Sequence, residues 1–117
     1  MADDDKIKLD FRVEAARVAE APKPFLELFK RHDVLVELYV PRDSDKQGLH
    51  DRDELYIVIT GYGTFRRGDE LVRFEAGDVL FVAAHVRHRF ETFSGDFKTW
   101  VIFFGPQVAT GPKDNRE

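Results

Sequence analysis

The chain has 117 residues, no cysteine and a net charge of −4. This length predicts one domain with a sizeable hydrophobic core, and the absence of cysteine excludes disulfides and thiolate metal sites. Lys and Arg are scattered among acidic residues, which argues against a nucleic-acid partner. No apolar run approaches the ~18 residues that span a bilayer. The acidic start MADDDK lacks the apolar core of a secretory signal, so we expect a cytoplasmic protein without a membrane partner.

For residues 1–33 we expect a charged leader followed by one short helix within residues 11–33. Phe25, Leu28 and Phe29 follow the i, i+3, i+4 spacing of an amphipathic helix, and Pro24 suits a first helical turn. A helix this short is not stable alone in water. We therefore expect it to pack on a larger barrel or on a partner subunit.

In residues 34–106, short predicted strands alternate with polar turns. The predicted strands include VLVELYV, ELYIVIT, HRFETF and FKTWVIFF, and the turns between strands include PRDSDKQG, RRGD, EAGD and SGD. Such strands, at intervals of about eight to twelve residues, predict an all-β sandwich or barrel. Residues 107–117 contribute few apolar side chains, which predicts a flexible tail.

Two predicted strands are apolar on both faces. Residues 55–59 (LYIVI) and 100–104 (WVIFF) place an apolar side chain at every position. The outer sheet of a lone barrel in water is expected to alternate apolar and polar residues instead. We therefore expect the outside to be covered by the N-terminal segment or by a second copy of the chain, and favour a homodimer.

Three polar residues, His50, Glu54 and His88, lie in or next to the predicted strands. His88 and Thr92 share one face of the strand HRFETF, whereas its Arg and Glu face water, so His88 is predicted to point inward. A buried imidazole and carboxylate must satisfy each other or bind a cation, because unpaired buried charge is costly. On a flat strand His50 and Glu54 would lie roughly 13 Å apart, so one shared ion requires a bend or bulge at residues 50–53.

The segments around these residues resemble the two motifs of the cupin superfamily. The first motif reads G, five residues, H-x-H, three or four residues, E, six residues, G. Here Glu54 is followed by six residues and Gly61, and His50 takes the place of the second histidine. The second motif reads G, five residues, P-x-G, two residues, H, three residues, N. Residues 77–92 follow it with His88 as its histidine, although Ala, His and Thr replace its proline, second glycine and asparagine.

The resemblance covers most of the chain and implies a small single-domain barrel of cupin type 2, a jelly-roll-like double-stranded β-helix. It also implies metal ligation by His50, Glu54 and His88. Gly48 stands where the family carries its first histidine, so Gln47 or water is a candidate further ligand. Two histidines and one carboxylate with open positions suit a catalytic divalent metal such as Fe, Mn, Ni or Zn.

The other two histidines have structural interpretations. His85 stands at the tip of a tight turn where glycine is usual, so we expect it to tolerate a strained backbone. His32 is expected to be a solvated residue after the helix.

Apolar side chains around the metal are expected to form a small cavity in the barrel mouth that takes a small-molecule ligand. One functional hypothesis is a metal-dependent oxygenase or isomerase or lyase. The alternatives are a non-catalytic ligand-binding module and a relict metal site of structural role. No motif names a substrate. The expected pocket lining comprises Tyr56, Val58, Phe81, Phe90 and Thr92.

Overall fold

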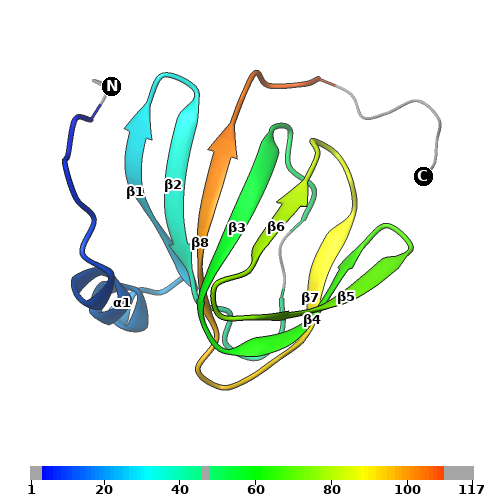
Figure 1. Cartoon of the computed structure of the whole chain (residues 1–117). Coiled ribbons are helices and arrows are strands. Elements are labelled where there is room, and N and C mark those ends of the chain that lie inside the picture. Colours follow the sequence, from blue (N-terminus) through cyan, green and yellow to red (C-terminus); the bar gives the residue numbers. More distant parts are fainter. Residues whose placement is uncertain (1–3, 46–47, 110–117) are drawn as a thin grey trace.

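Two antiparallel sheets face each other in the part of the chain that the structure describes, and a helix lies outside them (Figure 1). The computed structural model describes residues 4–45 and 48–109. The larger sheet has the strand order β1-β2-β8-β3-β6 and the smaller one β5-β4-β7. The predicted all-β barrel with a short N-terminal helix is confirmed. The elements are α1 (Phe11–Glu20), β1 (Phe25–Arg31), β2 (Val34–Tyr39), β3 (Asp53–Thr60), β4 (Tyr62–Arg67), β5 (Glu70–Glu75), β6 (Val79–Val82), β7 (His88–Phe93) and β8 (Lys98–Phe104).

Aromatic side chains fill the space between the sheets. Tyr56 of β3 and Phe90 of β7 meet edge to face, with ring centroids 4.9 Å apart. Phe65 of β4 lies 4.7 Å from the ring of Phe90, and Val58 and Val101 close the cluster from the larger sheet. Each fully buried side chain of this kind contributes about 2 kcal/mol through burial alone, so the two sheets are held together mainly by this core.

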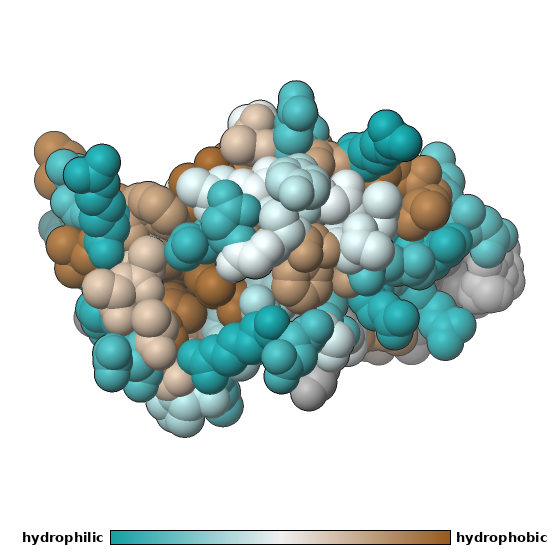
Figure 2. All heavy atoms as spheres, turned by 90° about the horizontal axis from the view of Figure 1, so that it is seen from below, coloured by the Kyte–Doolittle hydropathy of each residue, from teal (hydrophilic) through white to brown (hydrophobic). Residues whose placement is uncertain are grey.

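Helix α1 covers part of the outer face of the larger sheet. Asp10 caps its N-terminus by accepting a hydrogen bond from the backbone N–H of Val13 at 3.1 Å. Val18 packs in a second buried cluster with Leu28 of β1 and Leu38 of β2. Figure 2 shows apolar side chains gathered over the half of the molecule that carries the N-terminal segment. No helix in the described ranges is long and apolar enough to cross a bilayer.

The predicted helix around Phe25, Leu28 and Phe29 is wrong, because these residues belong to strand β1. This strand pairs with β2 along its length, with a register shift between Glu27 and Phe29. The irregularity leaves Leu28 unpaired in the ladder and buries it against α1. A bulged strand thus produces the i, i+3, i+4 spacing that resembles a helix, and the sheet begins at Phe25 rather than at Val34.

Both terminal segments are attached to the barrel where they are described. The backbone N–H of Asp4 donates to the carbonyl of Lys30 at 2.8 Å, and the Asp4 carboxylate accepts from the Lys30 N–H at 2.9 Å. The leader thereby covers the free edge of β1. At the other end the Val108 N–H donates to the carbonyl of Asp51 at 2.7 Å, and residues 110–117 of the predicted flexible tail lie outside the described residues.

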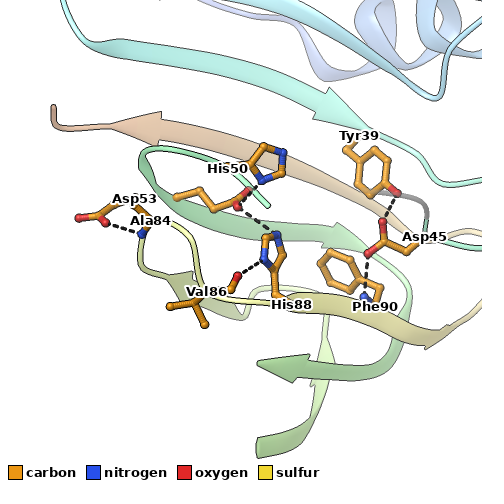
Figure 3. Close-up of polar contacts among 9 residues, drawn as sticks. Tyr39, Asp45, His50, Asp53, Ala84, Val86, His88 and Phe90 are labelled. Atoms are coloured by element: carbon orange, nitrogen blue, oxygen red, sulfur yellow. Dashed lines mark hydrogen bonds and ion pairs between the residues drawn. The ribbon is translucent and has the colours of Figure 1, made fainter. Parts of the chain in front are cut away.

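One buried carboxylate, that of Asp45, links the two sheets. Its Oδ1 accepts a hydrogen bond from the Tyr39 hydroxyl at 2.6 Å, and its Oδ2 accepts one from the Phe90 N–H at 2.8 Å (Figure 3). Tyr39 ends β2 in the larger sheet and Phe90 lies in β7 of the smaller one. Because one oxygen of this carboxyl group is bonded to each sheet, this loop residue fixes the spacing of the sheets.

We predict that Asp45→Ala lowers the free energy of unfolding by about 3 kcal/mol, because it removes both bonds and leaves their donors buried. Asp43→Ala is the matched control, since Asp43 is an exposed residue of the same loop, and it should change the stability by less than about 0.5 kcal/mol. Urea unfolding followed by tryptophan fluorescence measures both values. Equal stabilities of the two variants would contradict a role of Asp45 in holding the sheets.

Candidate metal centre

The structure brings His50, Glu54 and His88 together at one point. Nδ1 of His50 lies 3.0 Å from Oε1 of Glu54, and Nε2 of His88 lies 3.1 Å from the same oxygen (Figure 3). The chain bends at residues 51–52, immediately before β3. This bend folds His50 back over Glu54, so the separation expected of a flat strand does not apply.

The turn before β7 positions the two histidines. The backbone N–H of His85 donates to the carbonyl of His50 at 2.7 Å. The carboxylate of Asp53 accepts from the N–H of Ala84 at 2.9 Å. Nδ1 of His88 lies 2.8 Å from a carbonyl in the same turn, Val86 O, and donates to it. The loop that carries His50 and the strand that carries His88 are therefore tied to one short segment.

The remaining histidines stand apart from this triad. His85 has a positive φ of 65°, as expected for a tight turn, and its Nε2 contacts the carbonyl of Val108. His32 has a φ of 54° and is exposed in the turn between β1 and β2. It follows a strand and not the predicted helix.

The carboxyl group of Glu54 is almost fully buried, at 1% exposure. Burial raises its pKa, but the imidazoles of His50 and His88 outweigh that effect and lower the pKa to about 2. For His88, burial lowers the pKa, whereas the contact with Glu54 raises it above the ordinary value. The carboxylate thus favours any positive charge held between the three side chains, whether a proton or a metal cation.

Two buried atoms of the triad lack hydrogen-bond partners within the described residues, Oε2 of Glu54 and Nε2 of His88. The 3.1 Å contact of Nε2 with Oε1 does not have hydrogen-bond geometry. In the neutral imidazole, donation from Nδ1 leaves the lone pair of Nε2 free to coordinate. The three ligand atoms lie within 4.8 Å of one another. Because unpartnered buried polar atoms cost about 1–3 kcal/mol each, this donor set fits a divalent transition metal.

The further ligand position is open at Gly48. A Cβ placed on Gly48 would have no atom of the described residues within 4 Å, its chain neighbours aside, so the described part of the chain leaves space where the cupin motif carries a histidine. Gln47, the predicted additional ligand, lies outside the described residues.

A cavity of about 310 Å³ opens beside His50. The side chain of His50 is 28% exposed, whereas those of Glu54 and His88 are 1% exposed. His88 and Gly48 border a separate cavity of about 500 Å³. A ligand in the cavity beside His50 reaches the triad past that residue. The cavity is lined by Phe25, Glu27, Leu35, Glu37, Tyr39, His50, Asp51, Arg52 and Phe103.

None of the five residues predicted to line the pocket borders this cavity. Tyr56, Val58 and Phe90 do face inward, but they fill the hydrophobic core. Phe81 is 43% exposed, because the alternation of β6 turns it to the outer face. Thr92 is also exposed, because a register shift in the pairing of β4 with β7 reverses its side. The predictions that Phe81 and Thr92 point into the barrel are wrong.

Glu37 is a candidate functional residue that the sequence analysis missed. Its side chain lies on the inner face of β2 and is only 9% exposed. Burial, followed by repulsion from Glu27, raises its pKa to about 7. It makes no hydrogen bond or ion pair with the described residues. The signal for it was a lone glutamate, in phase with Leu35 and Tyr39, within the apolar strand VLVELYV.

We predict that Glu37→Gln changes how stability depends on pH. The folded carboxyl holds its proton up to about pH 7, whereas the unfolded one loses it near pH 4.5, so the stability of the wild type falls as pH rises between these values. At about pH 8 the variant should be more stable by about 2 kcal/mol, and the difference should shrink toward about pH 4. Chemical unfolding across this range, with Glu20→Gln as the exposed control, provides the measurement. Parallel pH profiles for the wild type and Glu37→Gln would contradict the raised pKa.

The sequence model of the cupin domain family matches residues 35–103. The chain therefore belongs to the cupin family. It is also 31% identical, over 97 residues, to an uncharacterised protein of Streptomyces coelicolor. The matched region covers 81% of this chain and 91% of that protein.

Solved cupin structures share this fold at low sequence identity. A cupin superfamily protein from Desulfitobacterium hafniense has a TM-score of 0.59 and 22% identity, with 80% of this chain and 89% of that chain covered. An RmlC-like cupin from Methanocaldococcus jannaschii, described as a double-stranded β-helix, has a TM-score of 0.60 and 18% identity, with 73% and 83% covered. These similarities show the fold alone, and they confirm the predicted double-stranded β-helix.

Proposed function

We propose that this cupin binds one divalent transition-metal ion through His50, Glu54 and His88 and acts as an enzyme on a small organic molecule. The observation that carries the proposal is the convergence of two imidazoles on a buried carboxylate whose Oε2 has no partner in the described residues. Three protein ligands leave coordination positions open, as in catalytic rather than structural sites. The cavity beside His50 gives a molecule access to those positions.

The chain's own residues would orient the ion and exclude water. His88 is fixed by donating Nδ1–H to the carbonyl of Val86, and Glu54 supplies the compensating negative charge. The ring of Phe103 lies 4.9 Å from that of His50 and shields one side of the site. Bound Fe, Mn, Ni or Zn would supply Lewis-acid or redox chemistry, of the oxygenase or the isomerase or lyase class.

The open position at Gly48 favours a second candidate function, a non-catalytic cupin that holds a small ligand or keeps a relict metal site. In that case a proton on the imidazole of His88 supplies the positive charge beside Glu54 in place of the cation. Metal content therefore separates the metal-dependent enzyme from this second candidate function.

We predict that protein purified without chelator and without a histidine tag contains about one equivalent of a divalent metal. His88→Ala and Glu54→Gln should each lose it, because each removes one of three ligands, whereas His32→Asn should retain it as the histidine control outside the triad. Elemental analysis by mass spectrometry gives the stoichiometry. Wild-type protein that stays metal-free after incubation with Fe(II), Mn(II), Ni(II) or Zn(II) would contradict the proposed function.

We also propose that the protein is a homodimer joined through the outer face of the larger sheet. Phe29, Val36, Ile102, Leu55 and Phe81 pair in register across β1, β2, β8, β3 and β6. They form one apolar row on the side away from the core. Helix α1 packs elsewhere on this face, against the cluster around Leu38. A second copy of the same face supplies the apolar partner that the row requires.

We predict a sedimentation mass near twice the 13.6 kDa chain. Phe81→Asp should give monomers, because it places a charge within the apolar row. Val72→Asp is matched to it in exposure, at 45% against 43%, but lies in β5 of the other sheet and should leave the dimer intact. A monomeric wild type at micromolar concentration would contradict this assembly.

A further inference from the structure

We propose that the cavity beside His50 binds the ammonium group of a small organic amine, held by the carboxylates of Glu37 and Glu27. The nine residues that line this cavity are called the acidic chamber below. The inference rests on the proposed function, because it names the class of molecule that the chamber presents to the metal triad.

Two carboxylates face the acidic chamber from adjacent strands. Glu27 of β1 stands directly opposite Glu37 of β2 in the register, and both line the chamber. Like charges in directly opposed positions destabilise a sheet. Neither carboxylate makes a hydrogen bond or ion pair within the described residues, although Glu37 is more than nine-tenths buried. A cation between them would remove the repulsion and give the Glu37 carboxylate a polar partner, which it lacks among the described residues.

The charge balance of the acidic chamber also favours a cation. Its lining carries three acidic residues, Glu27, Glu37 and Asp51, against one arginine, Arg52. The guanidinium of Arg52 is partly engaged: Nη1 donates to the carbonyl of Asp33 at 3.1 Å and the group lies 5.9 Å from the ring centroid of Phe103, whereas Nε has no partner within the described residues. An anionic ligand would meet an excess of negative charge on the side of β1 and β2.

The apolar walls suit the carbon skeleton of such an amine. Phe25, Leu35, Tyr39 and Phe103 surround the carboxylates, and aromatic faces attract ammonium groups. The volume of about 310 Å³ is at the lower end for ligand pockets. A hydroxyl group would donate one hydrogen bond to Glu37, but it would leave the repulsion between the carboxylates in place. The amine is therefore the better match than the corresponding alcohol.

The test compares benzylamine with benzyl alcohol, and butylamine with butanol, by NMR titration of the full chain at about pH 8, where the amines are protonated. The wild type should bind at least one amine about tenfold more tightly than its alcohol, equivalent to about 1.4 kcal/mol. Glu37→Gln should abolish this preference and Glu27→Gln should reduce it. Glu20→Gln, at the exposed end of α1, should keep it. Equal affinities within each pair, no binding of either amine, or an unchanged preference in Glu37→Gln would overturn the inference.

The same titrations on His88→Ala separate this inference from the proposed function. His88→Ala, whose substituted residue lies outside the chamber lining, should keep the amine preference while losing the metal. Amine preference in a wild type that takes up none of the four metals would support the acidic chamber and contradict the metal-dependent enzyme. Stoichiometric metal in a wild type that binds amine and alcohol equally would support the proposed metal site and contradict the acidic chamber as an amine site.

Discussion

A carboxylate buried beneath two imidazoles is the interaction on which the functional site of this barrel and its supporting loops depend. Glu54 lies on the inner face of β3, where an unpaired negative charge would cost several kcal/mol. His50 and His88 offset that cost by reaching the same oxygen at 3.0 and 3.1 Å. Their positions require the bend before β3 and the hydrogen-bonded turn before β7. The local backbone and the chemistry of the site are therefore parts of one arrangement.

The alternation of side chains in the larger sheet connects this site to its surroundings. On the inner face, Glu37 and Phe103 border the cavity that leads to His50. On the outer face, Val36 and Ile102 belong to the apolar row that we propose as the dimer contact. Neighbouring residues of β2 and β8 thus serve the cavity and the outer surface in turn. A change of register in either strand would disturb both, because a slip of one residue exchanges the two faces.

The sequence predicts the strands and the triad better than it predicts the cavity. The interval from Glu54 to Gly61 and the inward phase of His88 depend on regular strands, which period-two alternation describes well. The cavity depends on β1, whose irregular pairing at Leu28 gives a helix-like spacing. Thr92 lies on the face opposite to the one that alternation predicts because of a similar irregularity. A bulge arises from pairing with a distant strand, so the local sequence carries little sign of it.

The most direct test of the metal centre is a crystal structure of zinc-loaded protein, with anomalous diffraction measured on both sides of the zinc absorption edge. We expect one anomalous peak at about 2.0–2.2 Å from Nδ1 of His50, a carboxylate oxygen of Glu54 and Nε2 of His88. The three side chains should then separate from their direct contacts to surround the ion. A peak bound elsewhere, with His88 still in contact with Glu54, would contradict the account.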